Sequence, residues 1–253
     1  MADPIARELL RRRPEGPADA LGVDVSGGDP DALFRWLVTA LLVSAPISAT
    51  LAMGGARALF AAGLGTPRRM AEARWTDRVA ALDAGGYARL DEKTATQLGA
   101  LAEAVRDRWD GDLGRLREAA GRDPAAIRAR LTEFKGIGTV GADVFCREAQ
   151  RAWPELFPFA DAKALAAAEK LGLGADAAAL AARLDRREDL PRLLTALVGA
   201  DRAGELEEIH RTESETGQFT LVFLAPPGQH DRPIELTYNW DSGEEYDGGR
   251  NFG

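Results

Sequence analysis

The sequence is poor in residues that bind metals and form disulfides. Its 253 residues include one cysteine, Cys146, and two histidines. A single cysteine cannot form a disulfide within the chain, and it cannot supply the thiolates of an iron–sulfur cluster or a cysteine-rich zinc site. We therefore expect no iron–sulfur cluster, and the cysteine usage fits a reducing compartment such as the cytoplasm.

Long apolar runs are missing as well. No stretch approaches the roughly 18 apolar residues that a membrane span needs. The first 16 residues, MADPIARELLRRRPEG, are charged and have no apolar centre of the kind found in signal peptides. Hydrophobic residues make up 45% of the chain and charged residues 28%, as in ordinary soluble proteins. We expect a cytoplasmic protein that does not contact a membrane.

The acidic excess lies at one end of the chain. The net charge is -8, but residues 1–200 hold 28 Lys and Arg against 28 Asp and Glu, while residues 201–253 hold 4 against 12. Such a step in charge is typical of a domain boundary. The first 200 residues are neutral as a whole, so a local basic patch on them can still bind nucleic acid.

The hydrophobic periodicity changes at the same place. Up to about Ala203 the chain is a succession of amphipathic helix patterns, whereas after Gly204 two runs rich in β-branched and aromatic residues flank a Pro/Gly-rich connection. We predict a mainly α domain over residues 1–203 and a short β segment over 204–253 that does not fold alone. The predicted helices fall within residues 29–45, 66–73, 75–86, 91–111, 123–134, 161–174 and 190–200.

The segment LTEFKGIGTVGADVF, residues 131–145, predicts two helices joined by a tight glycine turn. A second helix that begins at Thr139 would leave its first amides unbonded at the positive end of the helix dipole. Glycine lets another backbone approach, so a phosphate oxygen suits this position. A purely structural turn is the alternative. The residues predicted to contact a DNA backbone are Lys135, Gly136, Ile137, Gly138, Thr139, Val140 and Gly141.

The turn and its surroundings resemble the helix-hairpin-helix DNA glycosylases of the endonuclease III-like (HhH-GPD) superfamily. The likeness covers about residues 25–200 and is carried by three segments, ALLVSAPISA, FKGIGTVGADV and FPFADAKAL. It implies a two-lobed helical fold with a cleft for double-stranded DNA, and a monovalent cation held by hairpin carbonyls. Asp161 matches the family's aspartate beside the flipped-out nucleotide and is the expected catalytic residue. An N-cap of the following helix is the alternative role, and one residue can serve both.

The sequence departs from this pattern at chemically important positions. Bifunctional family members carry a Schiff-base lysine where this chain has Val140, and an isopropyl group cannot act as a nucleophile. Pro46 replaces the usual glutamine of the first segment. The resemblance therefore implies a monofunctional base-excision glycosylase without strand cleavage, or else a catalytically silent DNA-binding protein.

Several other conspicuous residues have simpler interpretations. Lys163 could offer an alternative amine to a substrate, although ion pairing or plain surface exposure is the default. Asp143 and Arg11 to Arg13 are expected on solvated surfaces, and Cys146 is expected to be buried and inert. Four tryptophans at helical spacing are expected in the core rather than in base stacking. They are Trp36, Trp75, Trp109 and Trp153.

The C-terminal segment resembles a fragment of glyoxalase I, the lactoylglutathione lyase of the vicinal oxygen chelate superfamily, through the run IELTYNW. The resemblance implies a metal-ligand role for Glu235 and glutathione contacts for Asn239 and Arg250. A zinc or nickel site needs about four ligands and this fragment supplies one, so lyase activity is expected only if another chain completes the site. The strands are predicted to dock on the helical domain, to remain poorly ordered, or to mediate self-association by pairing with another chain.

Overall fold

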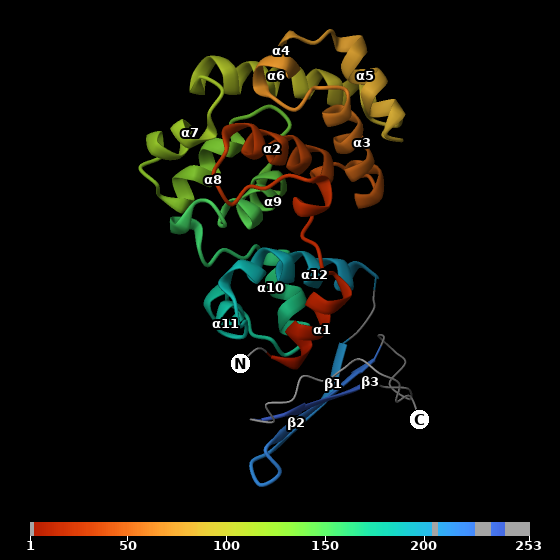
Figure 1. The fold of residues 1–253 in the computed structure, drawn as a ribbon, viewed down its shortest axis with the longest axis vertical. Helices are drawn as coiled ribbons and strands as arrows, with labels where there is room; N and C mark the ends of the chain where they lie inside the picture. Colours follow the sequence, from red (N-terminus) through yellow and green to blue (C-terminus); the bar gives the residue numbers. More distant parts are fainter. Residues whose placement is uncertain (1–2, 204–206, 226–233, 241–253) are drawn as a thin grey trace.

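The protein has two helical lobes followed by a small sheet (Figure 1). The computed structural model describes residues 3–203, 207–225 and 234–240. Two separate clusters of buried apolar side chains define a large lobe and a small lobe. The predicted mainly α, two-lobed fold with a short C-terminal β segment is confirmed.

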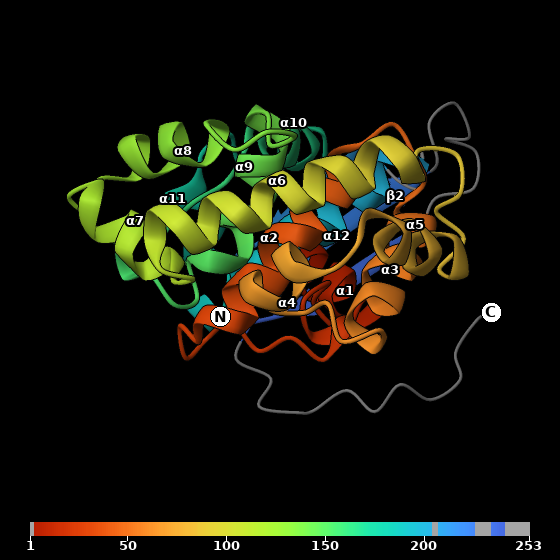
Figure 2. The same cartoon turned by 90° about the horizontal axis from the view of Figure 1, so that it is seen from above.

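The large lobe is built around α2, which spans Pro30–Ser44. This helix is apolar and buried along most of its length because α3, α7 and α9 pack on it. The long helix α6 crosses the lobe from the α7 side to the α5 side (Figure 2). The other helices of the lobe are α3 Ala49–Ala61, α4 Pro67–Glu72, α5 Trp75–Ala84, α6 Asp91–Trp109, α7 Leu113–Ala119, α8 Pro124–Thr132 and α9 Thr139–Ala149.

The small lobe is assembled from two distant parts of the chain. The first helix, α1, packs against the last helix, α12. Helix α10, which like α12 belongs to the later part of the chain, also packs against α12. Because of this pairing, the whole large lobe is inserted between α1 and α10 (Figure 1). The helices of the small lobe are α1 Pro4–Arg12, α10 Ala162–Lys170, α11 Ala177–Ala182 and α12 Leu190–Ala203. No helix in the described residues is both long and apolar enough to cross a membrane.

Most helices begin at a short polar side chain that accepts a hydrogen bond from an amide of the first turn. Within the described residues, α5, α6 and α9 differ, because their N-cap residues make no such side-chain bond. The first amides of these three helices are therefore left without a side-chain cap. The capping residues of α1 to α4, α7, α8, α10 and α11 are Asp3, Asp29, Ser48, Thr66, Asp112, Asp123, Asp161 and Asp176.

The three strands form an antiparallel sheet with the order β1–β2–β3. Along β2 the side chains alternate, and Val222 and Leu224 are buried in the core of the small lobe, with Leu236 of β3 packed against them. The described strands therefore dock on the small lobe, which was one of the three predicted arrangements. The strands are β1 Glu207–Ser214, β2 Phe219–Ala225 and β3 Ile234–Asn239.

Helices α1, α3, α7 and α11 were absent from the predicted helices, and for α3 its glycines explain why. Gly54 and Gly55 lower helix propensity, so the sequence pattern is weak there. In the structure the backbone of Gly54 lies so close to Gly85 that a Cβ on Gly54 would be 2.4 Å from the Gly85 carbonyl oxygen. Close packing against the end of α5, rather than propensity, stabilises this helix.

Candidate nucleic-acid interface

The predicted helix-hairpin-helix unit is present. Helix α8 ends at Thr132, α9 begins at Thr139 as predicted, and a turn between them is closed by a 3.0 Å bond from the Ile137 amide to the Phe134 carbonyl. Gly136 has φ +96°, which favours glycine, and a Cβ there would be 3.0 Å from Gln97 of α6. The first glycine of the hairpin is therefore required by the turn and by its packing.

The second glycine, Gly138, is constrained differently. It has an ordinary extended backbone, and a Cβ built on it would meet no atom of the described residues within 4 Å. It is the N-cap of α9 and provides no side-chain bond to the first amides of that helix. Open space at an uncapped helix start allows an anionic group from outside the protein to approach.

The seven predicted contact residues separate into two groups. Lys135, Gly138, Thr139 and Val140 are exposed, and Gly136 is half-buried. Ile137 is buried, and Gly141 is buried where a Cβ would be 3.4 Å from Ser44 at the end of α2. These last two residues position the turn on α2, so contact with a ligand falls to the exposed members.

An apolar cavity of about 530 Å³ lies between the lobes, and we call it the interlobe cavity. It lies beside the hairpin, because Val140 in the first turn of α9 lines it and is 42% exposed. From the large lobe α2 contributes Trp36 and α3 contributes Met53, while α12 of the small lobe contributes Val198. A cavity of this size and character fits an aromatic ring system.

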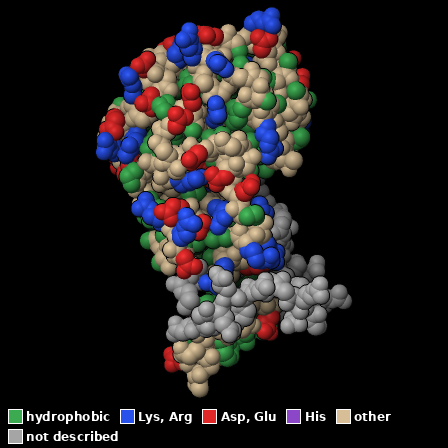
Figure 3. Space-filling view, in the orientation of Figure 1, with side chains coloured by type: hydrophobic (Ala, Val, Ile, Leu, Met, Phe, Trp, Pro, Cys, Tyr) green, Lys and Arg blue, Asp and Glu red, His purple; other side chains and the backbone are tan. Residues whose placement is uncertain are grey.

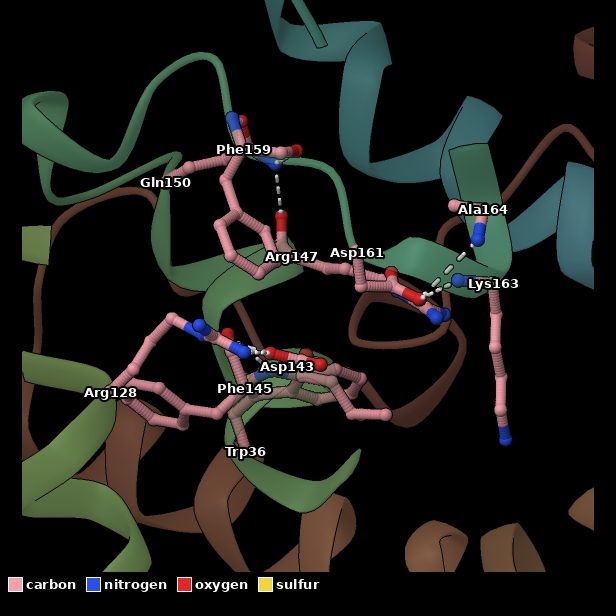
Figure 4. Close-up of polar contacts among 11 residues, drawn as sticks. Trp36, Arg128, Asp143, Phe145, Arg147, Gln150, Phe159, Asp161, Lys163 and Ala164 are labelled. Carbon is pink, nitrogen blue, oxygen red and sulfur yellow. Dashed lines mark hydrogen bonds and ion pairs between the residues drawn. The ribbon is translucent and has the colours of Figure 1, made fainter. Parts of the chain in front are cut away.

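Asp161, the predicted catalytic residue, is buried at the start of α10 (Figure 4). One carboxylate oxygen accepts the amides of Lys163 and Ala164 at 3.1 and 3.3 Å, and the other accepts a hydrogen bond from Nε of Arg147. Burial disfavours the charged form, but the hydrogen bond and charge of Arg147 outweigh it, so the pKa of Asp161 is lowered. Asp161 is thus an ionised N-cap paired with an arginine.

The cavity is lined by Arg147 and not by Asp161. Arg147 lies near the hairpin in the sequence but was not predicted as a site residue, although a signal for it exists. Val140, Val144 and Arg147 follow one another at four and three residues, which places them on one face of α9, and all three line the cavity. An interpretation that extended the hairpin face by two helical turns would have included the arginine.

A second ion pair lies close to the first (Figure 4). Arg128 of α8 binds Asp143 of α9, and the Arg128 guanidinium lies 5.8 Å from the centroid of the Phe159 ring. The expectation that Asp143 is solvated surface was wrong, because burial raises its pKa against the opposing hydrogen bond and charge of Arg128. The backbone of Phe159 is in turn bonded to the side chain of Gln150, which fixes the segment that leads to α10.

Three cations in the hairpin or the cavity have no side-chain partner in the part of the chain that the structure describes. Within the described residues, no hydrogen bond or ion pair involves the side-chain nitrogen atoms of Arg13, Lys135 or Lys163. Elsewhere charges of both signs are interspersed over the helical surface (Figure 3), and arginines such as Arg117 pair with acids. Figure 4 shows Lys163 pointing away from the Asp161 carboxylate. Two of the three, Arg13 and Lys163, line the interlobe cavity, and Lys135 lies in the hairpin, so positive charge is present at both features of a domain that is neutral as a whole.

One of these cations, Arg13, departs from the simpler expectation, whereas Lys163 is exposed as its default interpretation predicted. Arg13 was expected on a solvated face, but it is half-buried and lines the interlobe cavity together with Lys163.

Of the four tryptophans expected in the core, Trp36 and Trp153 are buried, Trp109 is half-buried, and Trp75 is 41% exposed. Trp75 donates instead to Thr96 at the surface of α6, so its predicted burial was wrong.

Cys146 is buried on α9 as predicted, and burial raises the pKa of its thiol to about 12.

In the sheet, Glu235 is exposed and its carboxylate accepts a hydrogen bond from Thr237, while Asn239 ends β3 opposite Phe219. The described residues contain no group of three or more His, Cys, Asp or Glu side chains arranged to hold a metal ion. Arg250 lies outside the described residues, so the glyoxalase-type roles of these residues stay predictions.

Comparison with known proteins adds one solved structure. No protein-family model matches the chain. No curated protein matches it in sequence. A trapped endonuclease III–DNA covalent intermediate in an estranged-adenine complex is similar in structure, with 17% sequence identity and a TM-score of 0.46, over 78% of this chain and 83% of that chain.

Proposed function

We propose that the protein binds double-stranded DNA and holds a nucleotide extruded from the duplex in the interlobe cavity. The observation that carries the proposal is that several features suited to nucleic acid lie close together at the start of α9. The uncapped start of α9 and the open space at Gly138 adjoin Val140, which lines an apolar cavity, and Lys135, which has no side-chain partner among the described residues, lies five positions before it in the hairpin. Open amides and a cation suit backbone phosphates, and an apolar cavity suits the base itself.

The associated reaction is hydrolysis of the N-glycosidic bond without strand cleavage. Val140 provides no amine at the hairpin, and ionised Asp161 is the candidate to stabilise positive charge that develops on the sugar. For this role its carboxylate has to be released from Arg147 when DNA binds. A monovalent cation at the hairpin carbonyls belongs to the same proposal, with no iron–sulfur cluster.

A second candidate is a DNA-binding protein without catalysis, and the state of Asp161 favours it. Both carboxylate oxygens are already bonded, and the positive charge of Arg147 offsets the negative charge that a glycosylase needs beside the sugar. A panel of duplexes, each with one damaged base, separates the two candidates. Base release that is lost in Asp161→Asn supports the enzyme, whereas binding without release on every duplex supports the silent protein.

Lys163 is the control for the chemical route, because its amine lines the cavity. We expect no covalent complex when the protein is incubated with an abasic duplex and borohydride. A trapped complex that disappears in Lys163→Gln would contradict hydrolysis without a Schiff base.

Gly138→Val tests DNA binding directly. The new side chain meets no protein atom at its Cβ position, so the fold is retained while the approach to the α9 amides is obstructed. We expect a loss of duplex affinity of about tenfold or more in a salt-dependent titration. Gly27→Val is the matched control, because that glycine is also exposed with open space around it. Unchanged affinity in Gly138→Val would refute the proposed interface.

The C-terminal segment is proposed to be an appendage of the helical domain. No observation on the described strands favours lyase activity, and we expect no metal-dependent turnover of methylglyoxal hemithioacetal by this chain alone. Self-association through the strands stays a prediction that sedimentation of the purified protein can test.

A further inference from the structure

The interlobe cavity is chemically one-sided. Its apolar wall includes Trp36, Met53 and Val198, and its charged groups are the cations Arg13, Arg147 and Lys163. No aspartate, glutamate, asparagine or glutamine lines it among the described residues. Its charged side chains can therefore donate hydrogen bonds to a ligand but cannot accept them, whereas the hydroxyls of Ser48 and Thr195, which also line it, can do both.

The three cations are not equivalent. Asp161 neutralises Arg147, whereas Arg13 and Lys163 have no partner in the described residues. Arg13 is also held in place, because its guanidinium lies against α12 at Gly199, where a Cβ would be 2.3 Å from Nη1. Arg13 is half-buried beside the apolar wall, so water screens its charge less than the charge of Lys163, which is exposed at the cavity.

We infer that the cavity selects neutral bases whose edges carry carbonyl acceptors, and that it rejects bases with a fixed positive charge. This inference rests on the proposed function, and it names the class of nucleotide that the same cavity takes. Uracil and hypoxanthine offer acceptors to Arg13 and Lys163, and they place no cation beside them. An N-alkylated purine such as 7-methylguanine carries a positive charge into a site that already holds two.

The experiment compares duplexes that differ in one nucleotide. Fluorescence anisotropy measures the affinity of the full chain for duplexes with uracil, hypoxanthine or 7-methylguanine, each carrying a 2′-fluoro sugar that prevents base release. We expect the uracil and hypoxanthine duplexes to bind about tenfold or more tightly than the 7-methylguanine duplex. Equal affinity, or tighter binding of 7-methylguanine, overturns the inference.

Charge reversal shows where the cations act. Lys163→Glu should lower affinity for the uracil duplex and raise it for the 7-methylguanine duplex, so that their ratio falls by about tenfold or more. If the variant weakens all duplexes equally, the cations contact the backbone and the inference fails. Arg68→Glu is the matched control, because Arg68 is exposed on α4, does not line the interlobe cavity and should leave the ratio unchanged.

Free nucleosides separate this inference from DNA binding itself. Calorimetry with 2′-deoxyuridine, 2′-deoxyinosine and 7-methylguanosine tests the cavity without a duplex. Preference for the neutral nucleosides supports the inference even if no duplex binds, in which case the proposed function alone fails. Duplex binding together with preference for 7-methylguanosine refutes the inference and leaves the proposed function intact.

Discussion

At the residue scale, the two hairpin glycines have separate reasons to be glycine. Gly136 is required by its positive φ and by the nearby Gln97 side chain, whereas nothing inside the described protein restricts a side chain at Gly138. The sequence pattern Gly-Ile-Gly alone does not distinguish the roles of the two glycines. The structure instead assigns the first to folding and leaves the second open to an external ligand.

This difference predicts opposite effects on stability. Gly136→Ala should lower the free energy of unfolding by about 1–3 kcal/mol, because an L side chain is strained at this φ and Gln97 has to move. Gly138→Val should change it by less than about 1 kcal/mol. Urea unfolding followed by circular dichroism measures both values, and equal destabilisation would contradict the assignment.

The pair of Arg147 and Asp161 gives a second prediction at this scale. Arg147→Met removes the hydrogen bond and positive charge that stabilise the ionised Asp161 carboxylate, so burial should raise the pKa of Asp161. The free energy of unfolding should fall by about 3 kcal/mol near neutral pH, because a buried charge loses its partner. The pH dependence of the Asp161 side-chain NMR signal measures the shift. Asp161→Asn should cost less than Asp161→Ala, since asparagine can still cap α10. A pKa that does not rise in Arg147→Met would show that the arginine does not control the carboxylate.

At the element scale, α9 connects three features of the molecule. Its first turn forms the hairpin, its middle lines the interlobe cavity, and its last turn buries Glu148. Glu148 is bonded through one oxygen to Arg151, and its other oxygen has no partner within the described residues. Burial raises the pKa of Glu148 from 4.5 to about 7 against the opposing effect of Arg151.

This shift predicts a pH-dependent stability. The pKa is higher in the folded than in the unfolded chain, so the stabilisation by protonated Glu148 is complete below about pH 4.5 and is lost as the pH rises to about 7. Glu148→Gln mimics the protonated form at every pH. Its free energy of unfolding should exceed that of the original chain by an amount that grows as the pH rises from 4.5 to 7 and reaches about 3 kcal/mol. Urea unfolding at several pH values measures this difference.

Glu155→Gln is the control with the opposite sign. In the original chain the Glu155 carboxylate pairs with Arg117, which lowers the pKa of Glu155. The stabilisation by ionised Glu155 is therefore present above the ordinary pKa of 4.5 and is lost as the pH falls through the lower pKa of the folded protein. The cost of Glu155→Gln should therefore be larger at pH 7 than at low pH. A difference between Glu148→Gln and the original chain that does not change with pH would refute the prediction for Glu148.

The elements show how far sequence reasoning reaches. Periodic apolar residues and an N-cap aspartate predicted α2 to within one residue at each end, and the glycine turn predicted the start of α9. Helix α3 was missed because contact between distant glycines stabilises it. Arg13 was misplaced because a run of three arginines gives no sign of which one turns inward. Local patterns determine helix ends, while the lining of a cavity depends on residues from both lobes.

At the scale of the whole molecule, the sheet has two opposing effects. Val222 and Leu224 complete the core of the small lobe, so the C-terminal segment contributes to stability. The chain from residue 201 onward, which includes this segment, carries 12 acidic against 4 basic residues, and that charge repels a polyanion. We therefore expect the segment that contains the sheet to stabilise the fold and to lower the proposed affinity for DNA.

Deletion of residues 204–253 should separate these effects. We expect a lower melting temperature, because apolar surface of the small lobe becomes exposed, together with a higher affinity for duplex DNA at low salt. Glu213→Gln combined with Glu215→Gln is the milder variant, since both side chains are exposed in or next to β1. This pair should raise affinity slightly without a change in melting temperature. If neither variant raised affinity, the acidic segment would not act on the interface.

The insertion of the large lobe between α1 and α10 also sets an order of events during synthesis. As the chain leaves the ribosome, α2 to α9 are complete before any partner of α1 has been made. The first helix must wait, unpaired, until α12 emerges some 180 residues later. The hairpin can therefore form before the second wall of the cavity, so a nascent chain can expose the first turn of α9 before the interlobe cavity is complete.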